Sequence, residues 1–163
     1  MKKIFLLIFI FLHFHSVSLA KNLKFSKIAS LDKPWGSSFI SNDEIIITEK
    51  SGKIKIINIL NGNVAEIEHN LNFLEYGQGG LLDILYKDNF IYVSYTENRA
   101  NWKTSTSIAK AKLDRENLLF KNIFQANPPI DSGYHFGSRL AIKDNFLFIS
   151  AGERGQGMIA QDP

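Results

Sequence analysis

The chain has 163 residues, of which 45% are hydrophobic and 21% are charged, and its formal net charge is +3. This composition supports a packed core and excludes wholesale disorder. The length is that of one modest domain or of a piece of a larger protein. The sequence contains no cysteine, which excludes both a disulfide framework and a thiolate metal site.

The first twenty residues have the pattern of a secretory signal peptide. Lys2 and Lys3 form a basic start, residues 4–14 are almost wholly apolar, and Ala20 ends a short run of small residues suited to cleavage. The alternative is an uncleaved membrane anchor, but the apolar run is shorter than the ~20 residues that span a bilayer. We therefore predict a signal peptide at residues 1–20, a periplasmic or secreted protein, and no membrane span after cleavage.

The charge of the mature protein would be close to neutral. Cleavage removes Lys2 and Lys3 and no acidic residue, which lowers the net charge from +3 to +1. The remaining sequence has no basic run of the kind that follows a nucleic-acid backbone. We therefore expect no nucleic-acid partner.

Three segments of the chain resemble one another, at residues 43–48, 89–94 and 145–150, and the tetrapeptide Lys-Asp-Asn-Phe occurs at both 87–90 and 143–146. Their offsets of 46 and 56 residues are close to the period of repeated four-stranded propeller blades. The pattern predicts an all-β fold of the β-propeller type, because antiparallel sheets repeated at this period bury their faces against each other. An ordinary β-sandwich with chance similarity between segments is the alternative.

Each repeat predicts a first strand, a polar turn and a second strand. The predicted first strands cover residues 38–40, 82–86 and 140–142, and Asn/Asp turns at residues 41–43, 87–89 and 143–145 follow them. Further strands are predicted at residues 53–59, before an Asn61-Gly62 hairpin signal, and at residues 106–113.

The repeats cover only about two and a half to three blades, whereas propellers close with four to eight. We therefore expect residues 21–163 to be the N-terminal part of a longer propeller.

Residues that could carry chemistry lie at equivalent places in the repeats. Trp35, Gln78 and His135 each stand in a glycine-containing stretch just before a predicted first strand. The first strand of a propeller blade lies nearest the central axis, so we predict that these residues share one rim with Arg139. An imidazole there can act as a base near neutral pH, and an arginine can hold an anion with a planar fork of donors.

Each of these residues also has a structural interpretation. His135, between two aromatic residues, fits a half-buried structural histidine, and Gln78 among glycines fits a residue that hydrogen-bonds within its loop. Arg139 could pair with Glu153 or Asp83. Both kinds of interpretation remain open from the residues alone.

Other charged residues and motifs give weaker signals. Glu153 and Arg154, in a glycine-bounded turn, could form a solvated pair worth under about 1 kcal/mol. Asp83 lies in an apolar run and needs a partner if it is buried. His69 and His135 make no metal-ligand pattern, and no Gly-x-Ser-x-Gly, His-Glu-x-x-His or dinucleotide-binding signature occurs. We predict no metal ligand in this chain.

Several short motifs follow one another in the sequence, and their combined order is more specific to a protein family than any single motif. They are Lys33-Pro34-Trp35-Gly36, Thr48-Glu49-Lys50-Ser51-Gly52-Lys53, Gly77-Gln78-Gly79-Gly80-Leu81-Leu82-Asp83, Val93-Ser94-Tyr95-Thr96, His135-Phe136-Gly137-Ser138-Arg139-Leu140, Gly152-Glu153-Arg154-Gly155 and Ala160-Gln161-Asp162. Together they resemble the soluble quinoprotein aldose dehydrogenases, also called the glucose/sorbosone dehydrogenase family. The resemblance covers nearly all of residues 30–163.

The resemblance implies a six-bladed propeller that holds pyrroloquinoline quinone (PQQ) and Ca²⁺, and that oxidises the C1 hydroxyl of an aldose to a lactone. His135 matches the family's general base, which takes the hydroxyl proton as hydride passes to the quinone. Gln78 matches a glutamine at the cofactor and the sugar, Arg139 matches an arginine assigned to the cofactor side, and Gln161 matches a residue on the sugar side. The implied partners are an aldose and an external electron acceptor.

This chain also departs from the family pattern. Tyr134 stands where related glucose dehydrogenases have an acid beside the histidine, and Glu153 stands where aspartate is usual. The chain covers less than half of the family's usual length, so we expect most PQQ and calcium ligands to lie beyond Pro163 and this chain alone to be inactive. The alternative function is that of a non-catalytic secreted propeller that binds carbohydrate or protein at the same rim.

Overall fold

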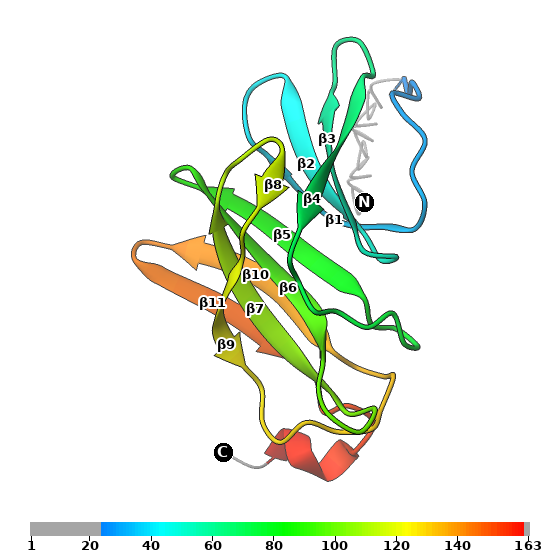
Figure 1. Ribbon diagram of the computed structural model, residues 1–163, viewed down its shortest axis with the longest axis vertical. Helices are drawn as coiled ribbons and strands as arrows, with labels where there is room; N and C mark the ends of the chain where they lie inside the picture. The colour runs from blue at the N-terminus through cyan, green and yellow to red at the C-terminus, as the bar shows by residue number, and fades with distance from the viewer. Residues whose placement is uncertain (1–23, 162–163) are drawn as a thin grey trace, which may run out of the picture.

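The computed structural model describes residues 24–161, so the predicted signal peptide lies outside the described residues (Figure 1). Eleven strands and one 3-10 turn follow in chain order. They are β1 (Pro34–Phe39), β2 (Glu44–Glu49), β3 (Lys53–Asn58), β4 (Val64–His69), β5 (Leu81–Lys87), β6 (Phe90–Asn98), β7 (Thr104–Lys112), β8 (Asn117–Leu118), β9 (Lys121–Gln125), β10 (Gly137–Lys143), β11 (Phe146–Ala151) and η1 (Gly157–Gln161).

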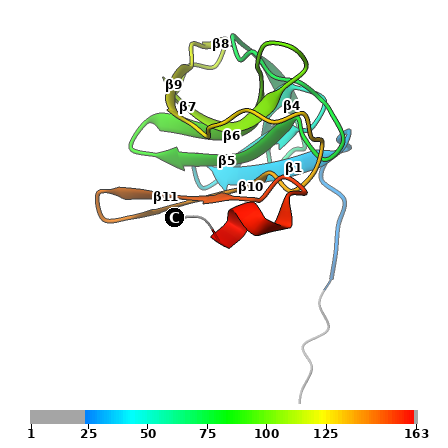
Figure 2. The ribbon, with the colours of Figure 1, turned by 90° about the horizontal axis from the view of Figure 1, so that it is seen from below.

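The strands form three sheets that follow the predicted repeats. The first has the order β1-β2-β3-β4-β8, the second β5-β6-β7-β9, and the third is the hairpin β10-β11. The sheets stack face to face, with β1, β5 and β10 lying side by side (Figure 2). In the first sheet, β1 to β4 form an antiparallel blade and the short β8 pairs with β4 in parallel. Two such blades of four antiparallel strands and the first hairpin of a third confirm the all-β, partial-propeller prediction.

The turns between the first two strands of the second and third blades have backbone conformations that suit the residue types found there. Asp88 and Asn89 between β5 and β6 both have positive φ, at 50° and 64°, and Asp144 between β10 and β11 has φ of 53°. Asn and Asp tolerate this left-handed conformation better than other residues with a side chain, which is why such pairs close hairpins. The turns predicted at residues 87–89 and 143–145 are confirmed.

The first strand of the first blade is longer than predicted. It begins at Pro34 rather than at residue 38, so Trp35 lies within β1 and not in a loop before it. The cause is a register shift between Pro34 and Ser37, which interrupts the strand pairing without ending the strand. Equivalent shifts occur in β5 between Leu81 and Ile84 and in β10 between Gly137 and Leu140.

The hydrophobic core lies between the first two blades. Isoleucine, leucine and valine from both sheets are almost fully buried, including Ile46, Ile54, Leu81 and Val93. In β3, the buried Ile54 and Ile56 alternate with two more accessible lysines, as the sequence alternation predicts. No helix in residues 24–161 is long and apolar enough to cross a membrane.

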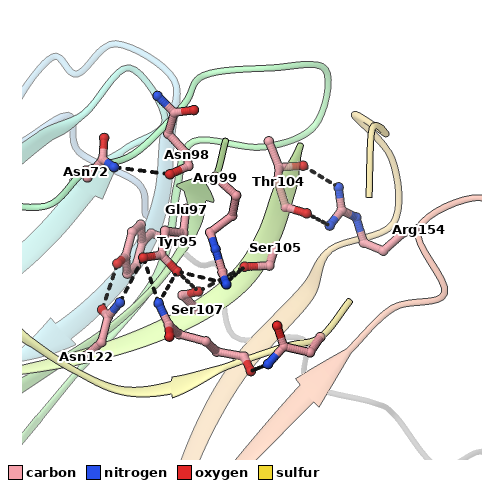
Figure 3. Close-up of polar contacts among 12 residues, drawn as sticks. Asn72, Tyr95, Glu97, Asn98, Arg99, Thr104, Ser105, Ser107, Asn122 and Arg154 are labelled. Atoms are coloured by element: carbon pink, nitrogen blue, oxygen red, sulfur yellow. Dashed lines mark hydrogen bonds and ion pairs between the residues drawn. The ribbon is translucent and has the colours of Figure 1, made fainter. Parts of the chain in front are cut away.

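Tyr95 gives a direct probe of this core. It is 2% exposed, and its hydroxyl donates a hydrogen bond to Asn122 Oδ1 at 2.7 Å, within a polar cluster around Glu97 (Figure 3). Burial is the main cause that raises the pKa of Tyr95 from 10.0 to about 12. Since only the unfolded state ionises between these values, the stabilising effect is complete below pH 10 and is lost as the pH rises towards 12.

We predict a late tyrosine ionisation, near pH 12, that belongs to Tyr95. Ultraviolet difference spectroscopy of tyrosinate formation should show this late step in the native chain. The step should be absent in Tyr95→Phe, while Tyr92→Phe, on a less buried neighbour of the same strand, should retain it. A late step that persists in Tyr95→Phe would contradict the assignment.

Candidate functional site

Gln78 lies in a loop whose glycines allow close contact with a second loop. A Cβ at Gly77 would lie 2.4 Å from the carbonyl oxygen of Gly133, closer than real atoms approach. The Gln78 N–H donates to the same carbonyl at 2.7 Å. The loop before β5 is therefore packed directly on the loop before β10, which carries His135.

His135 is held in a conformation that is unusual for a residue with a side chain. Its φ is 49°, in the left-handed region, and its N–H donates to Gln78 Oε1 at 2.9 Å. A Cβ at Gly152 would lie 2.0 Å from the His135 carbonyl oxygen, so glycine is required where the two segments cross. The predicted rim thus brings Gln78 and His135 into direct contact.

Glu153 orients the imidazole of His135. The Nδ1 atom of His135 hydrogen-bonds Glu153 Oε1, and the histidine side chain remains 52% exposed. This hydrogen bond is the largest cause that lowers the pKa of Glu153 below its usual value. An ionised carboxylate only accepts hydrogen bonds, so Nδ1 carries a hydrogen, and in the neutral imidazole the lone pair of Nε2 can take a proton.

Arg154 holds the loop that carries His135. Its guanidinium donates to the carbonyl oxygen of Thr104 at 3.1 Å and to Thr104 Oγ1 at 2.7 Å (Figure 3). The same group donates to the carbonyl oxygens of Tyr134, at 3.0 Å, and Ser132. It also lies over the Phe136 ring, 3.8 Å from the centroid. Arg154 is only 7% exposed, and this burial lowers its pKa to about 10. The expectation of a solvated Glu153–Arg154 pair is therefore wrong, because each residue has other partners.

Arg139 pairs with Asp83, one of the two structural alternatives. Its Nη1 lies 3.0 Å from Asp83 Oδ1, and Asp83 Oδ2 accepts the N–H of Leu140 at 2.8 Å. Asp83 is buried and Arg139 is 74% exposed. The hydrogen bonds and ion pairs found in residues 24–161 do not join Arg139 to His135. Gln161 ends η1, and its side chain lies outside the described part of the chain.

A pocket lies beside the Gln78 loop. Its volume is about 400 Å³, and its lining combines apolar and aromatic side chains with two carboxylates: Leu74, Glu75, Tyr76, Asn101, Trp102 and Asp131. Trp102 is 78% exposed and has φ of 61° in the β6–β7 turn. Within the described residues, no group of three or more His, Cys, Asp or Glu side chains could hold a metal ion.

Sequence reasoning missed the contacts that Glu153 and Arg154 make with the loop of His135. The available signal was the Gly-Glu-Arg-Gly motif directly after β11, in the repeat that also contains His135. The sequence does not show that the acid faces the imidazole, because 18 residues separate them. It also does not show that the arginine is buried, since arginine is mostly an exposed residue.

Comparison with known proteins identifies the family. Residues 31–163 match the Glucose / Sorbosone dehydrogenase family model. This chain belongs to the glucose/sorbosone dehydrogenase family. It is 32% identical over 142 residues to the aldose sugar dehydrogenase YliI of Escherichia coli, and 32% identical over 143 residues to an uncharacterised protein of Synechocystis. These alignments cover 81% and 78% of this chain but only 38% and 34% of the relatives.

Solved structures of the family have the same fold over this region. The apo form of the soluble E. coli aldose sugar dehydrogenase matches with a TM-score of 0.75 at 30% identity, over 81% of this chain and 41% of that one. The PQQ-bound aldose sugar dehydrogenase of Streptomyces coelicolor matches with a TM-score of 0.70 at 21% identity, over 84% of this chain and 43% of that one, which shows the fold alone. The partial propeller therefore corresponds to about two fifths of a family member.

We predict that Glu153 sets the tautomer of His135. Long-range proton–nitrogen NMR spectra of the neutral imidazole should show hydrogen on Nδ1 in the native chain, because the carboxylate accepts it there. Glu153→Ala should shift the hydrogen towards Nε2. Glu153→Gln keeps an acceptor oxygen and should preserve the native tautomer better than Glu153→Ala; equal spectra for the native chain and Glu153→Ala would contradict this role.

Proposed function

We propose that the complete protein containing this segment oxidises the C1 hydroxyl of an aldose to a lactone, with PQQ as the electron acceptor in its site. The observation that carries the proposal is the hydrogen-bonded set Gln78–His135–Glu153, in which an exposed imidazole has one nitrogen fixed by a carboxylate. Membership of the family and 32% identity to an aldose sugar dehydrogenase support the choice of substrate and reaction.

His135 acts as the general base in this proposal. Its Nε2 takes the proton of the C1 hydroxyl, and the Glu153 carboxylate on Nδ1 stabilises the imidazolium that forms. Gln78 accepts the His135 N–H through Oε1, which leaves its amide NH₂ group to donate to the sugar or to the cofactor. These roles need no movement of the loops, because the contacts are already formed.

The residues of this chain fit one part of a PQQ site. PQQ carries three carboxylates, and the exposed guanidinium of Arg139 can donate to one of them while Asp83 holds its other side. When bound, PQQ supplies the quinone that receives the hydride. Calcium, which the family resemblance also implies, has no cluster of ligands among the described residues. We therefore assign no residue of this chain to Ca²⁺.

The proposal includes export and an external electron acceptor. The signal-peptide pattern at residues 1–20 supports a periplasmic or secreted protein. A reduced quinone has to be reoxidised before the next turnover, which requires an acceptor outside this chain. The pocket lined by Tyr76 and Trp102, beside the Gln78 loop, also supports a second candidate, a propeller that binds a carbohydrate without oxidising it.

We predict that His135→Ala separates these two functions. A chimera in which residues 24–163 replace the matching N-terminal part of the E. coli aldose sugar dehydrogenase supplies a complete ring for the assay. In this chimera, His135→Ala should lower kcat for aldose oxidation by about 10²–10⁴-fold, the usual contribution of a general base. Tyr134→Phe, at the neighbouring exposed aromatic residue, is the matched control and should keep most activity. Unchanged turnover in His135→Ala would remove the assignment.

We also predict that the 163-residue chain alone does not oxidise sugars. Two blades and one hairpin leave one side of the site open, and Arg139 is the one residue of the chain to which we assign contact with a PQQ carboxylate. The chain should be mixed with PQQ, Ca²⁺ and an aldose, and dye reduction should be followed against the chimera as positive control. Robust turnover by the chain alone would contradict this expectation.

A further inference from the structure

The pocket of about 400 Å³ beside the loop before β5 has walls that are fixed to the hairpin of β6 and β7. The loop before β5 runs along the end of β6, where Asn72 and Asn98 are joined by two hydrogen bonds of 3.0 and 3.1 Å (Figure 3). On the other side, the backbones of Thr104 and Ile130 exchange hydrogen bonds of 2.9 and 3.0 Å. The walls of the pocket are therefore held in place without a ligand.

The indole of Trp102 is presented by a turn that does not suit it. Asn101 and Trp102 are the central residues of the β6–β7 turn, with φ of 59° and 61°, and the Lys103 N–H closes the turn on the Ala100 carbonyl oxygen at 3.3 Å. A hairpin turn with two positive φ angles strongly favours glycine at its second central position. Trp102 occupies this position and is 78% exposed, so packing against the described residues gives the indole little stabilisation. A strained residue that the fold does not require points to a function.

The lining of this pocket has the chemistry that binds a sugar ring. The indole of Trp102 offers a flat apolar face, on which the C–H groups of a pyranose ring can lie. The carboxylates of Glu75 and Asp131, when ionised, accept hydrogen bonds, and sugar hydroxyls donate them. Among the described residues, the lining contains these two carboxylates and no lysine or arginine, which favours a neutral ligand over an anionic one. The volume lies within the range of small-molecule sites.

The pocket shares its walls with the loops of Gln78 and His135. Tyr76 lies two residues before Gln78, and Asp131 lies four residues before His135. The two loops are in contact between these positions, because a Cβ at Gly133 would lie 3.4 Å from Tyr76 Cδ1. The pocket and the proposed base are therefore neighbours at the same end of the sheets.

We propose that this pocket, the Trp102 subsite, binds one sugar unit of a reducing oligosaccharide whose reducing end is oxidised at His135. The indole of Trp102 stacks on the bound unit, and Glu75 and Asp131 accept hydrogen bonds from its hydroxyls. The inference rests on the proposed function and adds the class of substrate, a chain of sugar units instead of a free monosaccharide. Binding energy from a part of the substrate that does not react can raise kcat/KM for that substrate. Such a gain gives the strained turn at Trp102 a purpose.

The first arm of the test measures binding by the 163-residue chain, which requires neither PQQ nor turnover. The sequence has two tryptophans, so Trp35→Phe leaves Trp102 as the only fluorescent indole. Titration with maltotriose, cellotriose and xylotriose should give a saturable change in its emission with at least one of the three. Asp131→Ala in the same background removes a hydrogen-bond acceptor and should weaken that binding by about 3- to 10-fold.

Trp102→Gly separates binding from folding. Glycine relieves the positive φ, so this variant should be at least as stable as the native chain in urea unfolding followed by circular dichroism. It also removes the stacking face, so calorimetric titration with the same trisaccharide should show at least about 5-fold weaker binding. A tryptophan that served only the fold would instead be missed as a loss of stability.

The second arm measures substrate specificity in the chimera with the E. coli aldose sugar dehydrogenase. Trp102→Ala should lower kcat/KM for the bound trisaccharide by about 5- to 30-fold, mainly through a higher KM. The same substitution should change kcat/KM for the matching monosaccharide by less than about 2-fold, because that substrate does not reach the Trp102 subsite. Lys103→Ala, in the same turn but outside the lining, is the matched control and should change neither value.

Two results would overturn the inference and leave the proposed function standing. One is a ratio of kcat/KM between trisaccharide and monosaccharide that Trp102→Ala does not change. The other is a Trp102 emission that responds to choline and to none of the trisaccharides, because the aromatic and acidic lining would then recognise a cation. A chimera that oxidises no aldose, while the chain still binds a trisaccharide at Trp102, would contradict the proposed function. The oxidation of the bound oligosaccharide would fall with it, and the sugar site itself would stand.

Discussion

The shifted pairing in each first strand is the constraint on which the arrangement of the blades depends. A register shift leaves backbone N–H and C=O groups without strand partners, and buried groups of this kind each cost about 1–3 kcal/mol if they stay unpaired. Thr48 and Ser94 remove this cost twice over, because each hydroxyl serves its own blade and the next one. The blades are therefore fixed relative to one another at the same strand ends that carry the loops of Gln78 and His135.

The buried Arg154 shows how the chain stabilises an unfavourable loop. A non-glycine residue in the left-handed region costs about 1–3 kcal/mol, and His135 adopts this conformation without a steric reason of its own. Arg154 bonds the carbonyls of Ser132 and Tyr134, and it lies on the Phe136 ring, so it contacts the backbone before His135 and the side chain after it. The acceptors around Arg154 are neutral, and they stabilise its positive charge less well than bulk water does. Burial therefore lowers the pKa of Arg154.

The strands and turns that depend on local residue preferences could be predicted from the sequence. Alternation in β3, Asn and Asp pairs in the hairpin turns, and the repeat period located most of the strands, but not β4, β8 and β9. The equivalence of the repeats predicted that Gln78 and His135 share one rim, where the structure brings them into contact. Prediction from the sequence failed for features that depend on tertiary contacts. The start of β1 lies before residue 38 because an interrupted strand looks like a loop in sequence, and the burial of Arg154 follows from three segments that meet in space.

The proposed site has two parts: a base with its partners, and the residues that bind the anionic cofactor. The two parts require different numbers of propeller blades. His135, Gln78 and Glu153 are held by contacts between two neighbouring loops and the end of β11, all within the described chain. Arg139, which we propose as a donor to one PQQ carboxylate, already pairs with Asp83, and one exposed arginine is a weak anchor for three carboxylates. A base positioned by local contacts can form before the ring closes. A cofactor site built from several blades gains its binding strength and its exclusion of water only when those blades have assembled.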